Sequence, residues 1–81
     1  HGTEDLSILT PLSVIKRAVV TNSKHIILVH NHPSGIVTPS RFDIDVTKAI
    51  KNACELCCIQ LEDQIIIADD DMYSMKKHEI I

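Results

Sequence analysis

The stretch that decides the fold is "ILVHNHPSGIVTPSRFDID", residues 27–45. It starts inside an aliphatic, β-branched run over 25–30, which is typical of a buried strand. Asn, Pro, Ser and Gly then interrupt the pattern and predict a loop over 31–39. From about 39 or 40 to 57 the apolar residues recur with helical spacing, which predicts a helix. The stretch therefore predicts a strand, a loop and a helix, with two histidines where the strand ends.

The sequence before this stretch predicts one more helix, over about 11–21. Thr10 suits the N-cap of that helix, and Pro11 suits its first position because the ring presets the helical φ angle. Its apolar residues are expected to share one face, made of Leu12, Ile15, Ala18 and Val19.

The sequence after the stretch predicts two more strands. Residues 58–68 alternate in polarity and then run apolar, which is typical of a strand. Three aspartates at 69–71 predict a turn, and 72–75 is expected to return as a short strand. The order helix, strand, helix, strand, strand indicates one small α/β domain without an internal repeat.

The second helix carries a polar residue on its apolar side. Its buried stripe is expected to consist of Val46, Ile50, Ala53, Cys54 and Cys57. Asp43 projects from the same side, towards the interior, and Ser40 shares that side three residues earlier. A buried carboxylate without a partner is costly, so Asp43 requires either the backbone N–H groups of the first turn or a cation.

Two histidines favour the cation. His30 and His32 are residues i and i+2 of an extended segment, so their imidazoles project to the same face. Two imidazoles and one carboxylate form a ligand set of catalytic zinc sites, with a fourth position left for water. Zinc lowers the pKa of that water and supplies a nucleophile at neutral pH. The sequence predicts one Zn²⁺ bound by His30, His32 and Asp43, with Ser40 as a catalytic residue that holds a ligand or donates to an oxyanion.

Other motifs explain the pattern less well. The letters HNH at 30–32 lack the ββα spread of an HNH nuclease, and the helical H-E-x-x-H of zinc proteases is absent. A lone H-x-H pair also fits ordinary polar residues at a strand end, but H-x-H, seven residues, then S-x-x-D is far more demanding. The remaining histidines, His1, His25 and His78, are expected to be solvated.

Composition and charge argue against nucleic-acid and membrane partners. The chain of 81 residues carries a net charge of −3, and its basic residues are scattered among acids. That distribution differs from the basic footprint of a nucleic-acid-binding protein. One Tyr and one Phe offer little for stacking on bases. The apolar runs are too short to span a bilayer, and no signal peptide is visible.

The three cysteines, Cys54, Cys57 and Cys58, are odd in number and clustered, which does not indicate a disulfide framework. A zinc knuckle needs a second pair of ligands at a suitable distance, and the sequence offers none. We therefore expect buried free thiols, away from the predicted zinc site, in a reducing compartment, the cytoplasm.

The H-x-H-x7-S-x-x-D motif formed by the four predicted site residues resembles the JAMM signature of the JAB/MPN+ metalloprotease superfamily. The longer string "ILVHNHPSGIVTPSRFDIDVTKAI" at 27–50, with Gly2-Thr3 before it and "IIIADDDMYSM" after it, looks like the RadC-like branch. The resemblance implies a cytidine-deaminase-like three-layer α/β fold with a mixed sheet flanked by helices. Residues 1–81 would form part of that domain, truncated at the N-terminus. The resemblance also implies Zn²⁺ bound by the two histidines and the aspartate, and a match to the family's serine at Ser40.

The sequence departs from the family pattern at two places. The family motif begins with a Glu that acts as general base, and in RadC-like sequences this Glu precedes the Gly-Thr pair. Here only His1 precedes that pair, so we expect the Glu to have been cut off and the chain alone to be a weak or inactive hydrolase. Glu4 is not expected to replace it. The second departure is Gln64, which follows Asp63 where RadC-like proteins usually have His, so any role of that histidine is in doubt.

Three classes of function follow from the sequence. The first is a zinc-dependent metallohydrolase of the peptidase or isopeptidase type, which implies a peptide or protein substrate. The second is a DNA repair-associated protein or metal-dependent nuclease, which the RadC-like resemblance suggests and the charge does not support. The third is a metal-binding MPN scaffold without catalysis. Salt-sensitive DNA binding would favour the second class. Nothing in the sequence indicates an oligomeric state.

Overall fold

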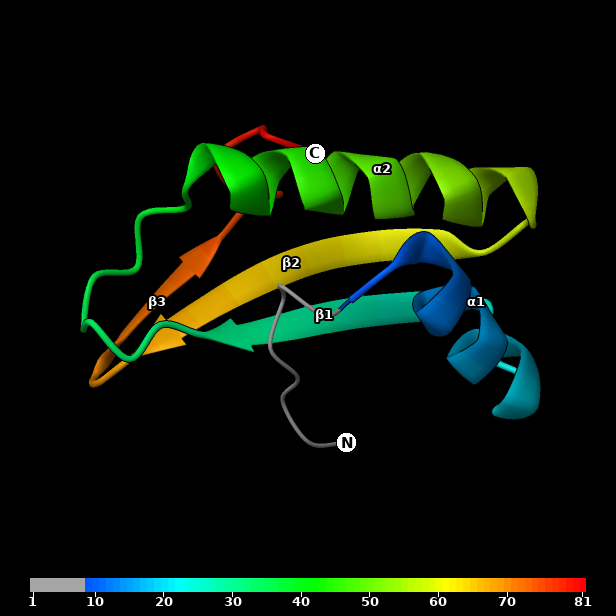
Figure 1. Cartoon of the computed structure of the whole chain (residues 1–81), viewed down its shortest axis with the longest axis horizontal. Coiled ribbons are helices and arrows are strands. Elements are labelled where there is room, and N and C mark those ends of the chain that lie inside the picture. Colours follow the sequence, from blue (N-terminus) through cyan, green and yellow to red (C-terminus); the bar gives the residue numbers. More distant parts are fainter. Residues whose placement is uncertain (1–8) are drawn as a thin grey trace.

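The computed structural model describes residues 9–81. They form α1 (Pro11–Val20), β1 (His25–Asn31), α2 (Arg41–Leu56), β2 (Gln60–Ala68) and β3 (Asp71–Ser74). Within these residues the three strands make one mixed sheet in the order β1-β2-β3, in which β1 and β2 are parallel and β2 and β3 antiparallel. Figure 1 shows α2 running along the length of β2, with α1 beside the start of β1. The predicted α/β class with a mixed sheet is confirmed, and the arrangement is compatible with a JAB-like fold.

Each of these elements occurs where the sequence predicts it, with small differences at the ends. The strand predicted from residue 58 begins at Gln60, because the preceding residues form the turn out of α2. In that turn Cys58 adopts a left-handed backbone with φ 60°, and the N–H of Ile59 donates to the carbonyl of Cys54 at 2.8 Å. None of the helices within residues 9–81 has the length and apolar character needed to cross a membrane.

The start of α1 is set by its cap, as the sequence predicts. Thr10 is the N-cap, and its hydroxyl accepts a hydrogen bond from the backbone N–H of Ser13 at 3.1 Å. In return, the backbone N–H of Thr10 donates to the Ser13 hydroxyl at 3.0 Å. Pro11 occupies the first helical position, where its missing N–H removes no hydrogen bond.

The core lies where both helices meet the sheet. Its buried members come from α1, α2, β2 and the turn before β2, and they are Val14, Ala18, Ile50, Cys54, Ile59 and Leu61. Of the stripe predicted for α2, Ile50 and Cys54 are fully buried, and Val46 packs against the cluster while remaining half-buried. The long helix therefore presents the predicted face to the sheet over most of its length.

The predicted buried face of α1 is partly wrong. Val14 and Ala18 are buried, whereas Leu12 and Val19 are 67% and 68% exposed. Apolar residues lie on most sides of this short helix, so their spacing does not select one face. Packing selects it, because Val14 and Ala18, four residues apart on one face, belong to the same core cluster as Ile50 of α2.

The prediction of three buried thiols is wrong for two of them. Cys54 is buried, but Cys57 and Cys58 are exposed. The helix α2 ends at Leu56, Cys57 is its C-cap, and the backbone at Cys58 is left-handed. Helical periodicity therefore does not predict the direction of the Cys57 or Cys58 side chain. The apolar stripe of the helix therefore stops at Cys54.

We expect native-state thiol labelling to separate these cysteines. Cys57 and Cys58 should react quickly, and Cys54 slowly. Burial raises the pKa of the Cys54 thiol, with a further rise from the nearby Cys57, so little reactive thiolate is present at Cys54. The measurement follows the aromatic thiolate that each cysteine releases from an aromatic disulfide reagent. The urea-unfolded chain is the control, in which all three cysteines should react alike. Fast reaction of all three in the native chain would contradict this assignment.

Candidate metal centre

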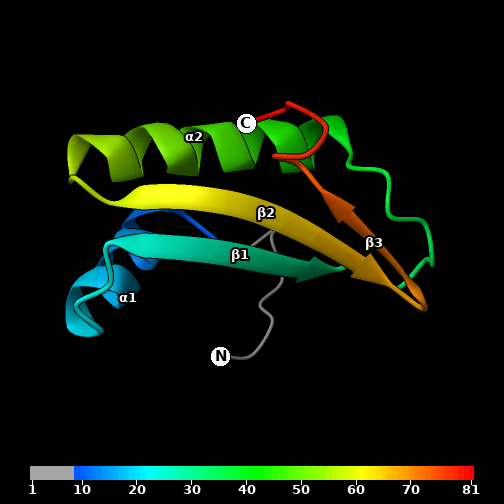
Figure 2. The same cartoon turned by 180° about the vertical axis from the view of Figure 1, so that it is seen from behind.

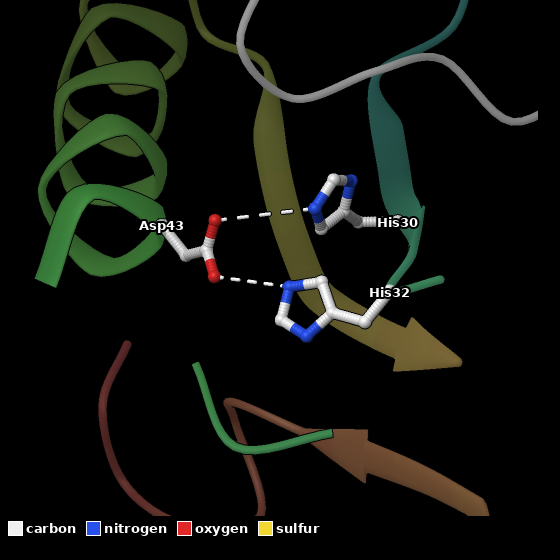
Figure 3. Close-up of side chains that lie close together, drawn as sticks. All are labelled: His30, His32 and Asp43. Atoms are coloured by element: carbon white, nitrogen blue, oxygen red, sulfur yellow. Dashed lines mark hydrogen bonds and ion pairs between the residues drawn. The ribbon is translucent and has the colours of Figure 1, made fainter. Parts of the chain in front are cut away.

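The three predicted ligands meet between the end of β1 and the start of α2 (Figure 3). The ligand atoms of His30, His32 and Asp43 all lie within 4.8 Å of one another. His32 Nε2 is 3.1 Å from Asp43 Oδ2, and His30 Nε2 is 3.9 Å from Asp43 Oδ1. The two carboxylate oxygens thus each face one imidazole, and the structure brings together residues that lie up to 13 positions apart in the sequence.

The pleat of β1 aims both imidazoles at α2. His30 lies within β1, and His32 follows the strand by one residue. The backbone N–H of His32 donates to the carbonyl of Ile67 at 2.9 Å, so the extended pairing with β2 continues through it. Residues two apart in an extended segment face the same side. The two rings meet edge to face with centroids 4.7 Å apart, and their side chains are 12% and 16% exposed.

A glycine allows the loop between β1 and α2 to fold back beside the site. Gly35 has φ 84°, a left-handed backbone conformation that residues with a Cβ atom rarely adopt. Its backbone N–H donates to the carbonyl of His32 at 3.1 Å. A Cβ atom at this position would lie 2.8 Å from the carboxylate of Asp69, in the turn that follows β2. The loop therefore packs closely against the β2–β3 turn before it leads to α2.

The start of α2 holds the carboxylate in place. Ser40 is the N-cap, and its hydroxyl oxygen accepts a hydrogen bond from the backbone N–H of Asp43 at 3.0 Å. The backbone N–H of Ser40 donates to Asp43 Oδ2 at 2.9 Å, which completes a reciprocal capping box. The sequence analysis missed this role of Ser40, although S-x-x-D at a helix start is itself a capping signature. Asp43 is buried in the first turn, where the helix dipole also favours its charge.

The hydrogen bond at Nδ1 of His32, the ring nitrogen away from Asp43, indicates whether the site fits a cation. His32 Nδ1 lies 2.8 Å from the carbonyl oxygen of Ile36. A carbonyl only accepts, so Nδ1 carries the proton, and Nε2 of the neutral ring then has a lone pair. That lone pair faces Asp43 Oδ2, another acceptor, at 3.1 Å. Two acceptors at this distance need either a shared proton or a metal ion between them.

The separations of the ligand atoms are near those that zinc requires. Zinc binds imidazole nitrogen and carboxylate oxygen at roughly 2.0–2.2 Å in a tetrahedral arrangement, so its ligand atoms lie about 3.3 Å from one another. In this site the imidazoles face different carboxylate oxygens, at 3.1 Å and 3.9 Å, and the three ligand atoms lie within 4.8 Å of one another, so the ligands would draw closer together to bind the ion. Neutral imidazoles with the proton held on the outer nitrogen are also the form that ligates zinc. The residues present therefore fit the ion that the sequence predicts.

Comparison with known proteins places the chain in a family. The family model described as RadC-like JAB domain matches residues 1–80. The chain belongs to the RadC-like JAB domain family. A UPF0758 protein of Pseudomonas syringae pv. tomato is 47% identical over 75 residues, which are 93% of this chain and 34% of the relative. A UPF0758 protein of Clostridium beijerinckii is 42% identical over 80 residues, 99% of this chain and 35% of the relative. The chain thus spans about a third of the length of the curated relatives it matches, and the resemblance found in the sequence is confirmed.

The other residues singled out in this RadC-like domain lie away from the metal site or outside the described part. His25 and His78 are exposed, as predicted, and neither belongs to the metal group found within residues 9–81. His25 Nδ1 lies 2.7 Å from a carboxylate oxygen of Glu62, and this hydrogen bond holds the pKa of Glu62 below its usual range. The sequence predictions for His1 and Glu4, and the Gly-Thr pair between them, fall outside the described residues.

Proposed function

We propose that this chain carries the zinc site of a metallohydrolase of the peptidase or isopeptidase type. The observation that carries the proposal is the arrangement of His32, whose proton is held on Nδ1 by a carbonyl while Nε2 faces the carboxylate of Asp43. His30 adds a second imidazole on the same side. Membership of the RadC-like JAB family supports the assignment, because the same motif is the signature of the wider metalloprotease superfamily.

Each residue has a separate part in the proposed chemistry. When bound, zinc supplies a Lewis acid that polarises a carbonyl oxygen and acidifies a water molecule. His30 and His32 contribute neutral ligands and Asp43 contributes one negative charge, so the site keeps a net positive charge for a developing oxyanion. The hydroxyl oxygen of Ser40 already accepts from Asp43, which leaves its hydrogen to donate to a substrate oxygen. In this proposal the proton acceptor is a residue outside 9–81, since the metal group within that range contains a single carboxylate.

The proposal is tested by metal-dependent cleavage. The zinc-loaded chain is assayed on a mixed peptide library and on an isopeptide-linked substrate, with duplex DNA as the control substrate. It is assayed alone and grafted into the full-length Pseudomonas syringae relative in place of the matching 75 residues. We expect cleavage of peptide or isopeptide bonds in the graft, lost with His32→Ala, and slower cleavage by the chain alone because general acid–base help is worth about 10²–10⁴-fold.

Two outcomes would overturn the proposal. Zinc binding without cleavage of any substrate, in the graft as well as in the chain, would identify a non-catalytic metal-binding domain. Cleavage of DNA alone would identify a nuclease, in agreement with the second class of function considered from the sequence.

A further inference from the structure

Three buried polar side-chain atoms within residues 9–81 have no hydrogen-bond partner. They are Nδ1 of His30 and both amide atoms, Nε2 and Oε1, of Gln64. Gln64 is 0% exposed, and its carboxamide is an uncharged group that offers both donors and an acceptor. Buried polar groups are rarely left without partners because leaving them unpaired is costly, so the coincidence of these three atoms requires an explanation.

Strand pairing places the two side chains next to each other. His30 on β1 pairs with Ile66 on β2, and Gln64 lies two residues before Ile66, on the same face of that strand. With ordinary strand spacings the Cα atoms of His30 and Gln64 are diagonal neighbours about 8 Å apart. Seen from behind, β1 and β2 run side by side in the same direction (Figure 2). Figure 3 shows the Nδ1 side of His30 turned away from Asp43, so that atom is left for a second partner.

The metal site needs a proton on this atom of His30. If Nε2 of His30 is to keep a lone pair for a cation beside Asp43, the ring proton must sit on Nδ1. A buried N–H at Nδ1 then needs an acceptor. His32 has such an acceptor in the carbonyl of Ile36, at 2.8 Å. Among the buried side-chain atoms without a partner in the described residues, the amide oxygen of Gln64 is the acceptor that remains for His30.

We propose that Gln64 is the positioning residue of His30. Its Oε1 accepts the Nδ1 proton of His30, directly or through one buried water, and so selects the tautomer that leaves Nε2 unprotonated towards Asp43. The part that concerns metal affinity rests on the proposed function, whereas the tautomer is a property of the metal-free chain. A neutral histidine at this position would likewise present an uncharged acceptor.

The test measures the tautomer of His30 and the affinity for zinc separately. Long-range ¹H–¹⁵N NMR of the metal-free chain at neutral pH should give the Nδ1–H form for His30 in the native protein. Gln64→Leu, which keeps the volume and removes the acceptor, should lose that preference and weaken zinc binding about 10- to 100-fold. Gln64→His should restore the Nδ1–H tautomer of His30 and bring the zinc affinity to within a few-fold of that of the native chain. Gln60→Leu, at an exposed position on the same strand, is the matched control and should change neither.

Each outcome bears on one proposal. An Nε2–H tautomer of His30 in the native chain, or a tautomer unchanged by Gln64→Leu, overturns the role of Gln64 whatever happens to the affinity. The native tautomer also tests the role without any variant, in case Gln64→Leu does not fold. If the native chain binds no zinc while its His30 tautomer still depends on Gln64, the proposed function fails and the positioning role stands.

Discussion

The His32→Ala chain is expected to lose its tight zinc site. The substitution removes the imidazole whose Nε2 lies 3.1 Å from Asp43 Oδ2, and leaves His30 and Asp43 as two ligands. Loss of a partner that only hydrogen-bonds to a ligand typically weakens metal binding about 10- to 100-fold. Loss of the ligand itself should therefore weaken it by more than about 100-fold. The measurement is competition for zinc against a chelator of known affinity, with elemental analysis of protein purified without chelator.

The matched control for this substitution is His25→Ala. His25 is the first residue of β1, but it is exposed and hydrogen-bonded to Glu62, outside the metal group. Its replacement should leave the zinc affinity unchanged, and the native chain should bind about one equivalent. A folded native chain that takes up no zinc when it is supplied would refute the site, and so would a His32→Ala chain that still binds with native affinity.

The Ile66→Ala substitution is expected to remove a large part of the stability of the domain. Ile66 is 0% exposed on the central strand β2, where it pairs with His30 on one side and Tyr73 on the other. Truncation of a buried Ile to Ala costs about 2–5 kcal/mol, because it loses apolar burial and leaves a cavity. Domains have roughly 0.05–0.15 kcal/mol of stability per residue, which for 81 residues amounts to roughly 4–12 kcal/mol. Urea unfolding followed by circular dichroism measures the change in the free energy of unfolding.

Ile67→Ala is the matched control for Ile66→Ala. The residue type and strand are the same, but Ile67 points to the opposite face and is 38% exposed. Its truncation removes less buried area and should cost less than half as much free energy as truncation of Ile66. Equal losses in the free energy of unfolding for the two substitutions would show that Ile66 does not lie on the buried face of β2.

The sequence by itself determined the local elements and the grouping of the ligands. Thr10 and Pro11 mark the start of α1, and the β-branched run at 25–30 marks β1, because caps and strand patterns act over a few neighbouring residues. The i, i+2 spacing of His30 and His32 was enough to place both rings on one face, since the pleat of any strand alternates in the same way. The inward direction of Asp43 followed from helical periodicity in the same manner.

Only the tertiary structure decided which groups are buried and what they contact. The spacing of apolar residues in α1 did not select Val14, because that choice depends on packing near Ile50, 36 positions later in the sequence. The exposure of Cys57 depends on where α2 ends and the chain turns towards β2. The position of the unpaired Gln64 amide, on the strand beside His30, depends on the register of β1 with β2. Local periodicity reports the direction of a side chain from its own backbone, whereas burial and hydrogen-bond partners are set by residues that only folding brings near.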